Sequence, residues 1–194
     1  QVKALQTANL AKLSTDQVRA LTTAHIEVLS TEQMAALTTG QMSKLTADQV
    51  STLTAKQLSA ATTSSIAVLS TEGVATLDAV QVRALTNDQV KALTTSQAAA
   101  LTSTAISSMT TGQVAAMDSA DLAALSTQAV KALSAAALNV LSTSQLNAFT
   151  SDQIKALSST QLVAMSTDQL VAMSTAQVSA LTSDQTSVLT ARQV

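Results

Sequence analysis

The stretch Leu13-Ser-Thr-Asp-Gln-Val-Arg-Ala20 decides the fold of this chain, because the same eight-residue pattern begins again at Leu21 and continues to the end. We label its positions a to h, with Leu13 at a. Position a then holds Leu, Met, one Phe or one Ala at every eighth residue. Position e falls on Gln1 and again on Gln193, and 24 octads fit between them without an insertion or deletion.

Position b indicates where each helix begins. It is Ser or Thr in 21 of 24 octads, and the exceptions are Gln6, Asp78 and Asp118. Ser, Thr and Asp accept a hydrogen bond from a backbone N–H at a helix start. Position e, three residues later, is Gln in 17 of 25 occurrences. Ser/Thr-x-x-Gln is a capping box, so b is predicted as N-cap, c to e as the first turn, and f, g, h and a as the rest of a two-turn helix.

The charges agree with this interpretation. Position d carries eight of the twelve acidic residues and position g carries six of the ten basic residues. These positions lie near the start and the end of the predicted helix, where the helix dipole favours anions and cations respectively. The spacing also predicts ion pairs three residues apart. The candidate pairs are Asp16 with Arg19, Asp88 with Lys91, and Asp152 with Lys155.

One long helix does not fit an eight-residue repeat, because each octad rotates its apolar face by roughly 80°. The pattern instead predicts an all-α solenoid of short two-turn helices, one per octad, each N-capped by Ser, Thr or Asp. A β-solenoid is the alternative, since eight is even and Val, Thr and Ile suit strands. Abundant Ala, Leu and Gln, only three Gly and no Pro argue against it.

Composition restricts the partners. Hydrophobic residues make up 46% of the chain and are expected to form a core at positions f, h and a. Charged residues are 11% and the net charge is −2, which argues against a nucleic-acid partner. No apolar run is long enough for membrane insertion. There is no Cys, so disulfides and thiolate metal sites are excluded.

Residues 1–194 read as one continuous solenoid of 24 repeats without a linker or domain boundary. The chain opens at position e and closes at position f with Val194. Neither end shows the polar capping unit that a solenoid uses to cover its terminal core. We therefore expect a segment of a longer array, or a unit that associates with itself end to end.

No catalytic, cofactor-binding or metal-ligating residue is predicted, and the chain is not expected to be an enzyme. His25 is the sole His and replaces Gln at an e position, so it is interpreted as a polar member of a capping box. Acidic d positions could form a Ca²⁺ ladder, but Lys56, Arg192 and small residues interrupt the series. The six Met residues occupy core positions a and f. The Gln series is predicted to be internal, with amides that bond between stacked turns as well as within each box.

The repeat Leu-Ser/Thr-x-x-Gln-Val/Ile/Leu-x-Ala, as in residues 157–164, resembles octapeptide-repeat regions of very long bacterial secreted or surface proteins. The resemblance covers the whole chain and implies an extracellular filament or adhesin-stalk role. The leading hypothesis is therefore a structural protein that associates with itself end to end or laterally. The alternative is a binding module with no identified ligand, which presents Ser and Thr to glycan, ice or protein. That alternative expects Thr15, Thr23, Thr31 and Thr39 to form a flat exposed row.

Overall fold

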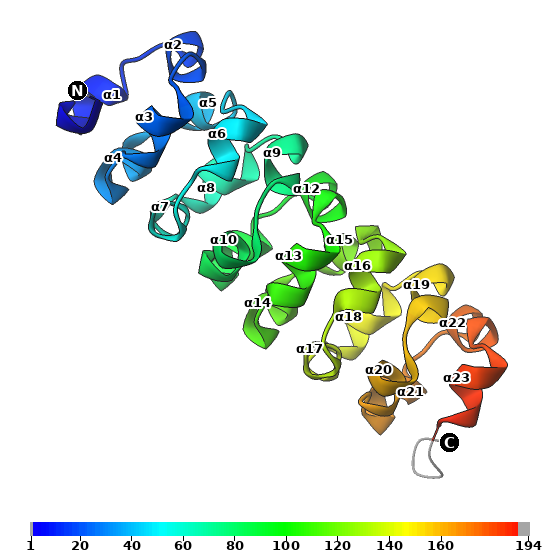
Figure 1. Cartoon of the computed structure of the whole chain (residues 1–194). Coiled ribbons are helices and arrows are strands. Elements are labelled where there is room, and N and C mark those ends of the chain that lie inside the picture. The colour runs from blue at the N-terminus through cyan, green and yellow to red at the C-terminus, as the bar shows by residue number, and fades with distance from the viewer. Residues whose placement is uncertain (1, 190–194) are drawn as a thin grey trace.

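A computed structural model describes residues 2–189. Within these residues it contains 23 short α-helices and one 3-10 helix, η1, with no strand. The chain coils steadily from its N-terminus to its C-terminus at the opposite end (Figure 1). The predicted all-α solenoid is confirmed, and the β-solenoid alternative is wrong for this part of the chain. The expectations for Gln1, Arg192, Gln193 and Val194 concern positions outside the described residues.

Each octad contributes one helix, and the helices follow in chain order. They are η1 (Val2–Ala4), α1 (Thr7–Leu10), α2 (Thr15–Arg19), α3 (Thr23–Glu27), α4 (Thr31–Ala36), α5 (Thr39–Met42), α6 (Ala47–Ser51), α7 (Ala55–Ala60), α8 (Thr63–Ala67), α9 (Thr71–Ala75), α10 (Ala79–Ala84), α11 (Asn87–Lys91), α12 (Thr95–Ala100), α13 (Ser103–Ser108), α14 (Thr111–Ala116), α15 (Ser119–Ala124), α16 (Thr127–Ala132), α17 (Ala135–Asn139), α18 (Thr143–Asn147), α19 (Ser151–Ala156), α20 (Ser159–Val163), α21 (Thr167–Val171), α22 (Thr175–Ala180) and α23 (Ser183–Ser187).

The b position restarts the helix in each octad, as the sequence predicts. Thr150 has extended backbone angles of φ −70° and ψ 160°, and its side chain accepts a hydrogen bond from the backbone N–H of Gln153. Ser158 has the same role for Gln161, with φ −75° and ψ 160°. The chain therefore leaves the helix at each b residue and enters the next one immediately afterwards.

The helices are shorter than predicted. Each contains four to six residues, fewer than the roughly 7.2 of two full turns. The a residue is not helical in α19, where Leu157 has φ −62° and ψ 137°. Its N–H still bonds to the carbonyl of Ile154 over 3.1 Å. Extended conformations at both Leu157 and Ser158 turn the chain through the corner, so these two residues are unavailable to the helix.

Each helix packs on the helix three octads later, so three octads complete one turn of the solenoid. The stacked helices form three columns along its length. The first column is α1, α4, α7, α10, α13, α16, α19 and α22; the second is α2, α5, α8, α11, α14, α17, α20 and α23; the third is α3, α6, α9, α12, α15, α18 and α21. Helices this short are unstable alone, so these stacking contacts hold them in place.

The core lies along the axis and is built mainly from positions f and a. In one octad Ile154 is 0% exposed and Leu157 is 3% exposed, whereas Ala156 at position h is only half-buried. The prediction for f and a is confirmed, but h lies at the edge of the core. Gln153 at position e is 2% exposed, so its polar side chain is also internal. Phe149 and all six Met residues are buried as predicted.

Candidate functional site

The most regular polar feature is the buried Gln at position e. In α19, the side-chain oxygen of Gln153 accepts a hydrogen bond from the backbone N–H of Thr150 at 2.8 Å. Its side-chain nitrogen donates to the carbonyls of Leu122 at 2.9 Å and Leu125 at 2.7 Å, 31 and 28 residues earlier. One amide therefore joins the start of α19 to the end of α15. The predicted bonding between stacked turns is confirmed.

We call this arrangement the Gln clamp. It recurs, with donation to carbonyls at the end of the helix four places earlier, at Gln33, Gln41, Gln49, Gln57, Gln81, Gln89, Gln97, Gln113, Gln145, Gln153, Gln161, Gln169, Gln177 and Gln185. Because a helix packs on the helix three octads earlier, its first turn lies beside the corner where the helix four octads earlier ends. The clamp gives a second donor to the Leu122 carbonyl, which already accepts the N–H of Leu125, and supplies a donor to the Leu125 carbonyl at the end of the helix, where the internal hydrogen bonds run out.

From α4 onward, six helices of the described chain lack the clamp because position e is not Gln. The residues are Ser65, Gly73, Ala105, Asp121, Ala129 and Ala137. The last three begin α15, α16 and α17, which together make one complete turn of the solenoid. All six are buried, so small side chains or a carboxylate fill the space that the amide occupies elsewhere.

Asp121 is the one charged residue among the buried side chains of the described chain. It is 3% exposed and accepts a hydrogen bond of 2.9 Å from the hydroxyl of Thr95, on α12. Burial raises the pKa of Asp121, the Thr95 hydrogen bond opposes that rise, and the charge of nearby Asp118 adds to it. The sequence analysis missed this residue, although an acid at a Gln position was a visible signal.

The caps at Asp78 and Asp118 differ. Asp78 accepts from the N–H of Gln81 at 2.8 Å, as predicted. Asp118 makes no side-chain cap bond, and the prediction for this residue is wrong. Three positions after Asp118 the chain has Asp121, whose side chain is a carboxylate, where most octads have the amide of Gln. Two carboxylates across one capping box repel each other, which opposes the bond that would bring them together.

His25 is a member of a capping box. Its ring nitrogen Nδ1 accepts a hydrogen bond from the backbone N–H of Thr22 at 3.3 Å, and the backbone N–H of His25 donates to the Thr22 hydroxyl at 3.2 Å. The interpretation of His25 as a polar replacement for Gln is confirmed. The side chain is exposed and serves the start of α3.

The exposed charges act separately. Between residues 2 and 189 no ion pair joins Asp16 to Arg19, Asp88 to Lys91 or Asp152 to Lys155, and these predicted pairs are wrong. The reason lies in exposure, since long side chains in water gain little from pairing.

The pKa of Glu32, at the start of α4, is lowered by hydrogen bonds from the backbone N–H of Glu32 and from the side chains of Ser30 and Thr31. Within the described residues, no group of three or more His, Cys, Asp or Glu could hold a metal ion.

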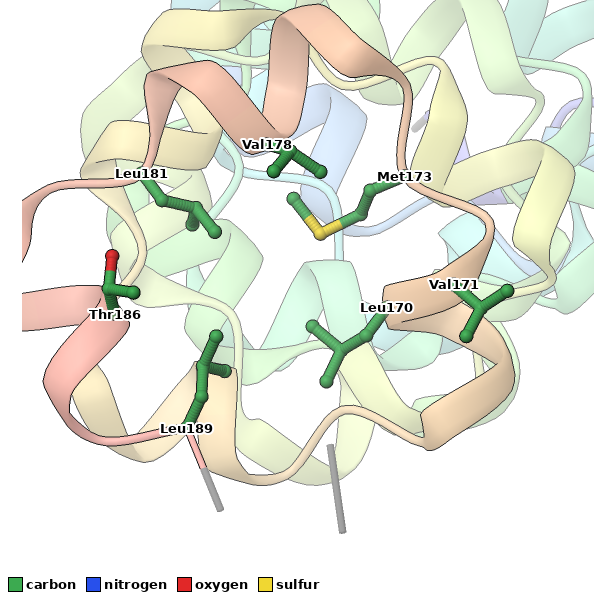
Figure 2. Close-up of a pocket in the computed structure, with 7 residues that line it drawn as sticks. All are labelled: Leu170, Val171, Met173, Val178, Leu181, Thr186 and Leu189. Atoms are coloured by element: carbon green, nitrogen blue, oxygen red, sulfur yellow. The ribbon is translucent and has the colours of Figure 1, made fainter. Parts of the chain in front are cut away.

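An apolar hollow of about 310 Å³ opens among the last three described helices (Figure 2). It is lined by Leu170, Val171, Met173, Val178, Leu181, Thr186 and Leu189. The Thr186 hydroxyl, the polar group of this lining, donates to the carbonyl of Thr182 at 2.8 Å. The lining offers apolar surface and carries no acid, base or metal ligand. This lining is therefore suited to contact with another apolar surface.

Two further findings concern membrane spans and curated relatives. Across residues 2–189, no helix combines the length and apolar character that a membrane span requires. A search of curated proteins found no match.

The repeat itself matches a known family model. The ALTTAQ repeat model matches residues 1–31, 16–47, 66–103, 114–151, 130–159, 138–167 and 154–191. All but the match to residues 66–103 overlap with another match, and together they cover well over half of the chain. This chain therefore belongs to the ALTTAQ repeat family.

Proposed function

We propose that this chain is a structural repeat segment of an extracellular bacterial filament, fibre or surface stalk, and that it performs no catalysis. The Gln clamp carries the proposal. It repeats the same interaction between successive turns, as in Gln153 to Leu125 and Gln161 to Leu133, and so produces a linear core of any length. Repeats that stack in this way form a rod.

The polar groups that could serve chemistry have structural roles. His25 caps α3, buried Asp121 accepts from Thr95, and the buried Gln amides bond to backbone groups. A nucleophile with a base and an orienting acid is the usual requirement for acyl transfer. The geometry of these residues favours a scaffold over an enzyme.

The extracellular and bacterial assignment rests on the resemblance of residues 157–164 to octapeptide repeats of long secreted or surface proteins. A chain without Cys, with 11% charged residues and with many Ser and Thr is compatible with that location. Nucleic acid is not proposed as a partner, because the net charge is −2 and phosphate binding requires a basic surface. Membrane insertion is not part of the proposal either.

We expect self-association end to end through the hollow among α21, α22 and α23. Val171 is 79% exposed and Val178 is 51% exposed, although both line this apolar surface. Another turn of the same repeat would bury it as successive turns bury one another within the chain. The low charge of the remaining surface also permits lateral packing.

Electron microscopy of the purified protein tests the proposal. Elongated particles that join into fibres are the expected result, and compact globular particles would contradict it. Val171→Glu should shorten the fibres because it places a charge at the hollow. Val80→Glu is the matched control, since Val80 is 65% exposed on α10, outside the hollow. Equal fibre lengths for both variants would contradict the end-to-end contact.

The alternative function is a binding or adhesion module that presents a regular Ser and Thr face to glycan, ice or protein. The expectation that Thr15, Thr23, Thr31 and Thr39 form one row is wrong, because they begin α2, α3, α4 and α5, which are distributed over all three columns. Rows instead join residues three octads apart. The second column aligns Thr15, Thr39, Thr63, Asn87 and Thr111 at its helix starts.

This second-column row supports the alternative. Thr39, Thr63 and Thr111 are exposed. Replacing these three residues with Lys should abolish binding to a glycan array or inhibition of ice growth, if the module has either activity. The absence of both activities in the unmodified protein would reject the glycan and ice versions.

A further inference from the structure

The exposed charges are distributed unequally among the three columns. In the third column, from the octad of α3 to that of α21, every exposed Lys, Arg, Asp or Glu is acidic. These residues are Glu27, Asp48, Glu72, Asp118 and Asp168. They lie on or at the start of α3, α6, α9, α15 and α21, which form one side of the solenoid.

The first column has the opposite balance. Its exposed cations are Lys12, Lys56, Arg83, Lys131 and Lys155, and its exposed anions are Glu32, Asp78 and Asp152. The second column is balanced among the described residues, with Arg19, Lys44 and Lys91 against Asp16, Asp88 and Asp184. One side of the molecule is therefore acidic and another is predominantly basic, although the whole chain is nearly neutral.

These charges are not neutralised within the chain. No ion pair joins them among residues 2–189, and the residues concerned are exposed. Most occupy positions d or g, three residues apart on a helix, and so point to the same outer surface. A side that carries a single sign of charge along many turns attracts a surface of opposite charge.

We infer that the third column of one copy lies against the first column of a second copy, with the two solenoids side by side. This inference rests on the proposed structural role and identifies the surfaces of lateral assembly. The two columns carry opposite charge and have the same spacing along the solenoid. Because both columns are built from the same octad, equivalent charges in either column recur after whole turns of the same solenoid, as Asp48 and Glu72 do in the third column and Lys131 and Lys155 in the first. A register that brings one pair together therefore brings others together.

The energetics predict a weak, salt-dependent contact. An exposed ion pair contributes little to binding, so several pairs are needed for measurable association. Salt at about 0.1 M screens charges beyond roughly 10 Å. Sedimentation velocity should therefore show larger species in about 0.02 M salt and their loss in about 0.5 M salt.

Charge reversal tests the two surfaces. The acidic-column variant is Glu27→Lys, Glu72→Lys and Asp168→Lys; the basic-column variant is Lys56→Glu, Arg83→Glu and Lys131→Glu. Each variant alone should lose lateral association in low salt, because its two columns then carry the same sign. A mixture of the two should recover it. Circular dichroism and thermal melting verify that both remain folded.

The control distinguishes loss of a pairing surface from a change of net charge. Arg19→Glu, Lys44→Glu and Lys91→Glu in the second column change the net charge as much as the basic-column variant does, and leave the first and third columns unchanged. Alone in low salt, this control should therefore keep the lateral association that the basic-column variant loses. Equal loss of association in the control and in the basic-column variant, or undiminished association of the acidic-column variant alone, would overturn the inference. Rods or fibres in electron micrographs would still support the structural role in that case, whereas compact particles would reject the role itself.

Discussion

The side-chain amide of Gln153 donates a hydrogen bond of 2.7 Å to the carbonyl of Leu125, 28 residues earlier in the chain. The same amide accepts the N–H of Thr150 at 2.8 Å. One side chain thus completes a local helix start and fastens it to a remote helix end.

Replacing Gln153 and Gln161 with Leu should lower thermal stability and leave helicity unchanged. Each substitution leaves buried backbone groups without partners, at a cost of about 1–3 kcal/mol per site. The melting temperature should fall by about 5–15 °C for the pair. The helices should persist because Thr150 and Ser158 still cap them. Thermal melting followed by circular dichroism measures both properties, with exposed Gln128→Leu as the control. An unchanged melting temperature would show that the clamps contribute no net stability.

Asp121→Gln should stabilise the protein at neutral pH. The new amide would have the carbonyls of Val90 and Leu93 as acceptors, which correspond to the 31- and 28-residue spacings of Gln153. It would also remove a buried charge. We expect a gain of about 1–3 kcal/mol in the free energy of unfolding, measured in urea. Asp121→Asn separates the two effects, because it removes the charge on a shorter side chain. Lower stability for the Gln variant than for the Asn variant would mean that the space at α15 is too small for a clamp.

The effect of Asp121→Asn should depend on pH. Burial raises the pKa of Asp121 in the folded state above its ordinary value of 3.8. Below that ordinary value the carboxyl is neutral in both states, so ionisation carries no penalty. As the pH rises, the unfolded chain ionises first, and the folded state loses stability until the pH exceeds the raised pKa. The advantage of the Asn variant should therefore be absent near about pH 3 and complete at neutral pH. An advantage of equal size at both values would contradict ionisation of Asp121 as its cause.

Gly40→Ala and Gly73→Ala should have opposite outcomes. A Cβ at Gly40 would lie 3.8 Å from the Thr15 side chain, an ordinary contact. Ala there should add about 0.5–1 kcal/mol through helix propensity. At Gly73 a Cβ would lie 3.0 Å from Cγ2 of Val50, which is 0% exposed. Overpacking should therefore exceed the propensity gain. Denaturant unfolding of both variants compares them, and greater stability of Gly73→Ala would show that Val50 can move without cost.

The sequence alone determined the local architecture. Ser or Thr at b with Gln at e predicted each helix start, and Thr150 with Gln153 forms that box as expected. These interactions span three residues and depend little on the rest of the fold. The same locality explains the correct placement of His25. It also explains the buried f and a positions, since the apolar residues of one octad must share one side of a short helix.

Only the tertiary structure decided what depends on the number of octads per turn. That number follows from the corner angle and from packing between turns, neither of which the repeat length specifies. Three octads per turn place the carbonyl of Leu125 beneath Gln153, and Thr95 beside Asp121. The same number sorts Glu27 and Lys56 into different columns. Stacking is a contact between remote segments, and its geometry emerges only when successive turns pack together.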